Sequence, residues 1–245
     1  MKPSPELVTR LLEALFRTWE EGGRLSVGKL SERALISREQ TARILSWLGI
    51  SGREFSLTED VKIDVVLKAF EIGIDGERLS RHLAWREFEK LVNKILRRSD
   101  YQTEWNLTVT HKRERCQIDL LAYRGRIMLL IDCKHWKRPP PPSAELKMIE
   151  AQERRLRVLK SLLRNIYPSD EGFHELYLVP MVLALYQPSK RILNGHLFGS
   201  IGKLRSLIEY VESAYFHVRH EKVKIPAELE LQKIIRDFKE KGSRF

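Results

Sequence analysis

Cysteine is scarce in this sequence, with only Cys116 and Cys133 among 245 residues. Their positions show neither a metal-ligand spacing nor a disulfide framework. No window of about 18 apolar residues is present, so no transmembrane helix is expected. The first ten residues, MKPSPELVTR, lack the apolar segment of a signal peptide. We therefore expect a cytoplasmic protein that does not associate with a membrane.

Acidic residues are fewer than basic ones, 33 against 44, which gives a net charge of +11. The excess is not spread evenly. Residues 1–80 contain 12 Lys and Arg against 13 Asp and Glu, whereas residues 81–245 contain 32 against 20, a net charge of +12. A strongly basic segment favours a polyanionic partner. The alternative is a solvated basic surface without a partner.

The first third of the chain has a helical pattern. Apolar residues recur at helical spacing in residues 5–20. Two shorter helices are expected at 26–34 and 37–48, the second with Ser37 as N-cap and Gln40 in the capping-box position. A small β-wing at 49–58 and a helix at about 59–72 follow.

This order of elements resembles the winged helix-turn-helix family. The resemblance implies that four side chains of the third helix face a DNA groove: Arg38, Gln40, Thr41 and Arg43. The lack of net positive charge in this region favours a module that binds a protein partner or packs on its neighbour. Gly73 and Gly76 mark the expected boundary, so we predict domains at 1–78 and 79–245.

The second domain mixes helices with strands. A helix is expected at 83–98, where apolar residues recur at helical spacing, and a basic helix is expected at 143–164. A final helix is expected at 226–241, with Pro226 in its first turn. The expected strands are 104–111, 116–123, 126–134 and 175–186, and a further helix begins near 199.

A charged pair ends the most apolar of these strands. Residues 127–131 are an uninterrupted apolar run, yet Asp132 and Lys134 follow directly. With Gly125 at the first central position of a two-residue type II′ turn, Asp119 faces Asp132 across the hairpin. Side chains alternate along a strand, so Lys134 lies on the same face as Asp132.

Two carboxylates directly opposed across a hairpin repel each other, because their Cβ atoms are only about 4.5–5.5 Å apart. Lys134 supplies one compensating charge. A divalent cation would supply the rest, and the hard oxygen ligands suit Mg²⁺. The alternative is an exposed strand end with a simple Asp–Lys ion pair.

Three segments in this order resemble the PD-(D/E)xK nuclease superfamily, which has the restriction-endonuclease-like fold. They are WREFEKLV (85–92), QIDLLAY (117–123) and IDCKHW (131–136). The nearest branches are the Mrr-like restriction enzymes and the archaeal Holliday-junction resolvases. The resemblance implies an α/β protein with a mixed sheet flanked by helices.

The resemblance also implies a role for each matching residue. Asp119 and Asp132 become metal ligands, Lys134 orients water or stabilises charge on the phosphate, and Glu89 assists the metal site. An ordinary surface acid is the alternative for Glu89. Ile118 stands where the superfamily name has Pro, and Asp132 stands where this branch often has Glu.

The basic helix holds further candidates. Gln152 occupies the place where some relatives carry a catalytic or DNA-contacting Gln, although a surface Gln is the simpler interpretation. Four cations on this helix could line a phosphate path, or could form a solvated face: Arg154, Arg155, Arg157 and Lys160.

The resemblance as a whole implies a Mg²⁺-dependent DNA endonuclease, with Mn²⁺ as a substitute. Its biological class would be restriction or structure-specific repair and recombination. A homodimer is expected, and the winged helix could recruit a protein partner. The alternative is a regulatory DNA-binding protein that uses the winged helix and keeps the nuclease fold as a scaffold.

Overall fold

The computed structural model describes residues 3–136, 140–168, 173–227 and 229–241. The chain divides into two compact units, Met1–Leu91 and Val92–Phe245. The division falls within one helix, α6 (Trp85–Arg98). The predicted domain boundary after residue 78 stays a prediction. Among the described helices, none combines the length and apolar composition that crossing a bilayer requires.

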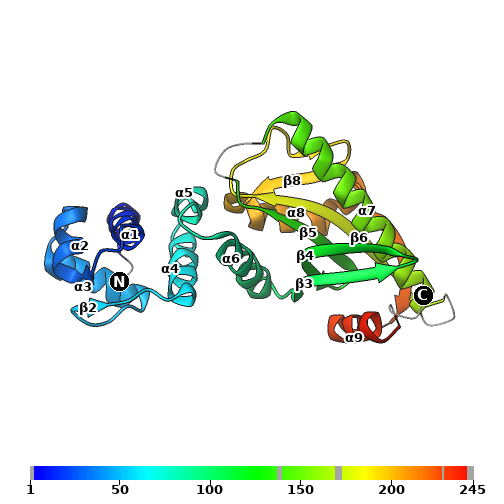
Figure 1. The fold of residues 1–245 in the computed structure, drawn as a ribbon, viewed down its shortest axis with the longest axis horizontal. Helices are drawn as coiled ribbons and strands as arrows, with labels where there is room; N and C mark the ends of the chain where they lie inside the picture. The colour runs from blue at the N-terminus through cyan, green and yellow to red at the C-terminus, as the bar shows by residue number, and fades with distance from the viewer. Residues whose placement is uncertain (1–2, 137–139, 169–172, 228, 242–245) are drawn as a thin grey trace. The chain divides into compact units, whose positions relative to one another are not determined.

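The N-terminal unit is helical, with one small two-stranded sheet (Figure 1). Strand β1 (Leu25–Ser26) pairs antiparallel with β2 (Glu54–Phe55). This follows the predicted order of elements, whereas assignment to the winged helix-turn-helix family stays a prediction. The helices are α1 (Pro5–Glu20), α2 (Val27–Ala34), α3 (Arg38–Leu48), α4 (Glu59–Glu71) and α5 (Gly76–Ser80).

Side-chain caps explain where three of these helices begin. Ser26, Ser37 and Thr58 each accept a hydrogen bond from a backbone N–H three residues later, at the start of α2, α3 and α4. Such caps satisfy amide groups that have no partner within the helix. The N-cap predicted at Ser37 is confirmed.

A buried ion pair joins α4 to the first turn of α6. Lys62 Nζ lies 2.8 Å from Glu87 Oε2, and both residues are almost fully buried, at 1% and 4% exposure. Glu87 Oε2 also accepts a hydrogen bond of 2.5 Å from the Ala84 backbone N–H. The Lys62 ammonium lies 3.9 Å from the ring centroid of Trp19. Lys62 is therefore compensated by a carboxylate and an aromatic face.

We expect Glu87→Gln to lower the free energy of unfolding of the N-terminal unit by about 3–5 kcal/mol, because it leaves the Lys62 charge buried without its partner. Urea-induced unfolding would measure the change. In the matched double variant Lys62→Met/Glu87→Leu, most of the loss should be recovered. A loss below about 0.5 kcal/mol in Glu87→Gln would contradict this account of the pair.

The C-terminal unit is built on a seven-stranded mixed sheet with the order β3-β4-β5-β6-β8-β7, in which β9 also pairs with β6. β3, β4 and β5 are antiparallel neighbours, whereas β5–β6 and β6–β8 are parallel. The strands are β3 (Gln102–His111), β4 (Glu114–Arg124), β5 (Ile127–Lys134), β6 (Phe173–Ala184), β7 (Ile192–Leu193), β8 (His196–Ser200) and β9 (Glu221–Pro226).

Helices flank this sheet on both sides. In Figure 1, α7 (Pro142–Ile166) crosses one face, and α8 (Leu204–Ala214) lies behind the other. α9 (Leu231–Lys241) packs against β3 and α7. One large core cluster joins the apolar face of α7 to β3, β4 and β5, with Leu130, Leu156 and Leu159 among its fully buried members. The predicted fold class, a restriction-endonuclease-like mixed sheet flanked by helices, is confirmed.

Two local predictions are wrong. Pro226 ends strand β9, and the final helix begins at Leu231 rather than at Pro226. Residues 196–200, which span the predicted helix start near 199, form β8. β6 pairs with β5 from Tyr177 to Ala184, Pro180 included, whereas its other edge pairs with β9 up to Leu178 and with β8 from Met181. The short strands β8 and β9 are stabilised by pairing with β6, which local sequence does not reveal.

Candidate active site

The β4–β5 hairpin has the predicted register. Leu120 pairs with Ile131, and Arg124 pairs with Ile127, which leaves Gly125 and Arg126 as the two-residue turn. Gly125 has a φ of 59°, as the first central position of a type II′ turn requires. Continuing the ladder by one residue brings Asp119 opposite Asp132, at the carboxyl end of β5.

The ladder is interrupted on the other side of Asp119. β3 and β4 pair on both sides of Asn106 and Asp119, but these two residues are not paired with each other. Asn106 has a φ of 53°, which is uncommon for a residue other than glycine. The Asp119 side chain reaches β5, where its Oδ2 accepts a hydrogen bond of 2.9 Å from the Cys133 backbone N–H.

Asp132 is the most deeply buried acid of the site, with 1% exposure. Lys134 Nζ lies 2.9 Å from Oδ2 and 3.0 Å from Oδ1 of Asp132. The guanidinium of Arg155 on α7 lies 3.0 Å from Oδ1, and its Nε donates a hydrogen bond of 2.7 Å to the Gln117 carbonyl. Two cations therefore compensate one buried carboxylate, and Arg155 links α7 to both strands of the hairpin.

Burial raises the pKa of Asp119, and the nearby charge of Asp132 raises it further. The Cys133 amide, Lys134 and Arg155 act in the opposite direction and lower that pKa. The net direction of this pKa shift is upward, and the part that comes from Asp132 is the repulsion between two facing carboxylates that the hairpin register predicts.

The two carboxylates fit a divalent metal ion. They are hard oxygen donors held close together, and their repulsion is what a cation would relieve. Within the described ranges, no group of three or more His, Cys, Asp or Glu residues could hold a metal ion. An ion here would therefore complete its coordination with water, backbone carbonyls or phosphate oxygens.

Two further candidates are buried. Glu89 is 2% exposed and belongs to the N-terminal unit, whereas both aspartates belong to the C-terminal unit. Its predicted role stays a prediction. Gln152 is fully buried, so the interpretation of a surface glutamine is wrong. Its amide donates hydrogen bonds to the carbonyls of Leu130 (3.2 Å) and Met181 (2.7 Å), which fixes α7 against β5 and β6.

The predicted phosphate path along α7 is only partly available. Arg155 has a side-chain exposure of 16% and is held by Asp132, so it is part of the acidic site. Sequence reasoning missed this contact. Arg154 donates a hydrogen bond of 2.9 Å to the Arg115 carbonyl, and Arg157 lies 3.2 Å from Glu114. Lys160 forms an ion pair with Glu221.

The predicted DNA-facing residues of α3 divide into two groups. Arg38 and Arg43 are exposed, and Gln40 is half-buried. Thr41 is fully buried and cannot contact a groove. Thr41 lies on the same helix face as the buried Ile44 and Leu45, and this spacing could have excluded it from the sequence alone.

The raised pKa of Asp119 makes a prediction for stability. A carboxyl group whose pKa is higher in the folded state stabilises folding at low pH, and this contribution is lost as the pH rises through the folded-state pKa. We therefore expect Asp119→Asn to raise the free energy of unfolding at pH 7 relative to the wild type. The gain should shrink as the pH falls toward 4. Chemical unfolding of both proteins at a series of pH values would measure it, and a lower stability of Asp119→Asn at pH 7 would contradict it.

Comparisons with known proteins match the segment of the chain that contains this site. Residues 80–153 match the family model Mrr_cat, described as restriction endonuclease. An uncharacterized protein of Archaeoglobus fulgidus is 26% identical over 139 residues, which cover 56% of this chain and 95% of the relative. No solved structure matches. The matched segment includes Asp119, Asp132, Lys134 and Gln152. The chain therefore contains a segment similar to the catalytic domain of the Mrr-like restriction endonucleases. This nuclease family typically uses a divalent metal.

Proposed function

We propose that this protein is a Mg²⁺-dependent DNA endonuclease, with Mn²⁺ as a substitute ion. Asp119, Asp132 and Lys134 form its catalytic group. One observation carries the proposal. At the carboxyl end of β5, a buried aspartate is ion-paired with a lysine, and a second aspartate lies beside them. This group falls within the segment that matches a restriction endonuclease family.

Asp119 and Asp132 would hold the ion, which when bound polarises the phosphate and lowers the pKa of bound water. The hydrogen bond from Cys133 to Asp119 fixes one carboxylate, and Arg155 fixes the other. Both ligands are thus oriented before an ion arrives. Their orientation depends on the strands and on α7, and an orientation fixed in advance lowers the cost of binding.

Lys134 differs from the aspartates in being partly accessible, with a side-chain exposure of 27%. Its ammonium can therefore meet a phosphate while remaining near Asp132. Water attacks phosphorus, the P–O bond to the leaving sugar oxygen breaks, and that oxygen takes up the proton that water loses, while negative charge grows on the phosphate oxygens. Lys134 stabilises that charge. Glu89 is proposed as the assisting helix carboxylate.

The positive charge of residues 81–245 provides affinity for DNA without reading its sequence. We propose a homodimer, in which two sites cut two strands. The biological class is either restriction or structure-specific repair and recombination. These classes differ in substrate, since a restriction enzyme cuts linear duplex and a resolvase prefers branched DNA.

A second candidate function is that of a regulatory DNA-binding protein. The observation that favours it is the exposure of Arg38 and Arg43 on α3, the helix that would enter a DNA groove in a winged helix-turn-helix module. In this candidate the N-terminal unit binds DNA or a protein partner, and the mixed sheet is a scaffold. An intact Asp119, Asp132 and Lys134 argues against it.

Cleavage of labelled DNA with and without Mg²⁺ tests the proposal. The panel holds linear duplex, single strand, flap and four-way junction. We expect Mg²⁺-dependent cutting that falls by a factor of roughly 10²–10³ in Lys134→Ala, because a group that stabilises transition-state charge is removed. Asp132→Asn should lose cutting as well, while both variants keep their affinity for DNA.

The matched control is Lys222→Ala. Lys222 is also a strand lysine in an ion pair, with Glu175 at 2.7 Å, but it lies on β9. This variant should cut at the wild-type rate. If the wild type binds DNA tightly and cuts nothing on the panel, the regulatory function becomes the better account. If DNA binding is lost with activity in Lys134→Ala, the ion pair is structural rather than catalytic.

A further inference from the structure

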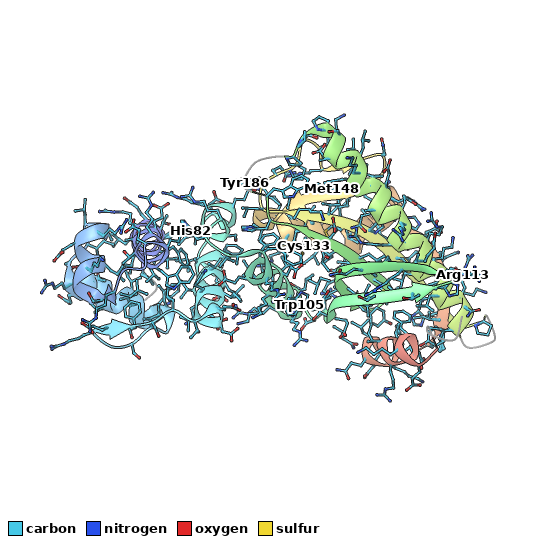
Figure 2. The ribbon with its side chains drawn as sticks, in the orientation of Figure 1. His82, Trp105, Arg113, Cys133, Met148 and Tyr186 are labelled. Atoms are coloured by element: carbon cyan, nitrogen blue, oxygen red, sulfur yellow. The ribbon has the colours of Figure 1, made fainter. Side chains whose placement is uncertain are left out.

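A basic pocket lies where the β3–β4 turn meets the C-terminal half of α7, and it includes neither aspartate of the candidate active site. Its volume is about 480 Å³. We call it the hairpin pocket. Figure 2 labels Arg113 in the turn, at the tip of the β3–β4 hairpin beside α7. The lining includes His111, Lys112, Arg157, Lys160, Ser161 and Arg164.

The cationic side chains of the hairpin pocket outnumber the acidic side chains that pair with them. Arg157 forms an ion pair with Glu114, and Lys160 forms one with Glu221. Within the described part of the chain, Lys112 and Arg164 form no ion pair. The pocket therefore presents two uncompensated cations, which favours an anionic ligand.

His111 supplies an independent indication of a ligand. It is 3% exposed and lines the pocket. Among the described residues, neither of its ring nitrogens has a hydrogen-bond partner. Burial lowers its pKa, and the charge of Lys112 lowers it further, which favours the neutral ring with one N–H donor. A buried donor without a partner is unfavourable, and a ligand that accepts its hydrogen bond would offset that cost.

The turn that carries Lys112 has an unfavourable sequence for its shape. His111 pairs with Glu114, so Lys112 and Arg113 form a two-residue loop. Their φ angles are 47° and 65°, as in a type I′ turn. That turn strongly favours Asn-Gly, because other side chains rarely adopt positive φ. The turn conformation does not explain why Lys112 and Arg113 stand at these positions, whereas binding of an anionic ligand does.

We propose that the hairpin pocket binds a phosphate group, and that this group is a backbone phosphate of the bound DNA. The second half of this statement rests on the proposed function. Phosphate fits the cations, and its oxygens accept the hydrogen bond that His111 can donate. A hydroxyl donor, Ser161, is also part of the lining.

The position of the pocket on α7 supports a backbone phosphate. Arg154, Arg157, Ser161 and Arg164 recur at intervals of three and four residues, so they share one face of the helix. This stripe begins next to Arg155, which contacts Asp132. From Arg155 to Arg164 the helix rises about 14 Å, at 1.5 Å per residue. That distance corresponds to roughly four nucleotides of one strand at 3.4 Å each.

The first test compares the binding of duplex DNA by full-length variants in the presence of EDTA, so that no cutting intervenes. Arg164→Ala should raise Kd roughly threefold to tenfold at moderate salt and reduce the slope of log K against log salt by about 1. Arg236→Ala is the matched control, since Arg236 is an exposed arginine of α9 outside the pocket. Equal losses in both variants would overturn the proposal in favour of general charge attraction.

The second variant separates binding from folding. Lys112→Asn/Arg113→Gly gives the turn its preferred residues, so thermal stability should be equal to or above that of the wild type. Its affinity for duplex DNA should nevertheless fall. Unchanged affinity in this stable variant would overturn the assignment of a phosphate to the pocket.

Inorganic phosphate distinguishes the two sources of the ligand. The NMR signals of the His111 ring should shift as phosphate is added, and Arg164→Ala should weaken that shift. If phosphate shifts His111 but neither variant affects DNA binding, the pocket takes a free phosphate, and the backbone assignment is overturned. If the variants weaken DNA binding while the wild type cuts no substrate, the pocket stands and the nuclease function fails.

Discussion

The compensation of Asp132 is the interaction on which the C-terminal unit depends. A carboxylate with 1% exposure at the end of a buried strand is tolerable only because Lys134 and Arg155 both lie within about 3 Å of it. Arg155 comes from α7 and also donates to the Gln117 carbonyl of β4. The same contact that neutralises the acid therefore fixes the helix across the hairpin. Gln152, one turn earlier on α7, adds hydrogen bonds to β5 and β6.

This arrangement is poor for stability, and in the proposed function it is suited to chemistry. Two aspartates facing two cations are formally neutral, yet the pKa of Asp119 stays raised because burial and Asp132 outweigh the cations. A core of apolar residues at these positions would be more stable. Unfavourable charge at the end of a strand is the local conflict that a functional site produces in an otherwise consistent fold. The apolar cluster beneath α7, with Leu156 and Leu159 fully buried, offsets its cost.

The sequence predicts local features such as the hairpin register, and it misses contacts between elements that are far apart along the chain. The hairpin register follows from Gly125 and the alternation around it, so the facing of Asp119 and Asp132 could be predicted. The contact of Arg155 with Asp132 could not, because it joins a helix to a strand 23 residues earlier. The sequence indicates that Asp119 and Asp132 need more positive charge than Lys134 supplies. It assigns that charge to a metal ion alone. β8 and β9 were missed because each is short and depends on pairing with β6.

The sheet topology explains why charge can gather at one edge. β5, β6 and β8 are parallel, and their registers bring Lys134, Ala184 and Ser200 into one row at their carboxyl ends. Carboxyl ends of parallel strands are where open α/β sheets commonly bind ligands, because the chain leaves the sheet there and frees space for a site. In this protein α7 follows β5 and returns over that edge, so Arg155 lies beside the acidic pair together with Lys134. A polyanion that approached the two aspartates without those cations would be repelled. In the proposed function, α7 both holds Asp132 through Arg155 and attracts the phosphate backbone toward it through its other cations.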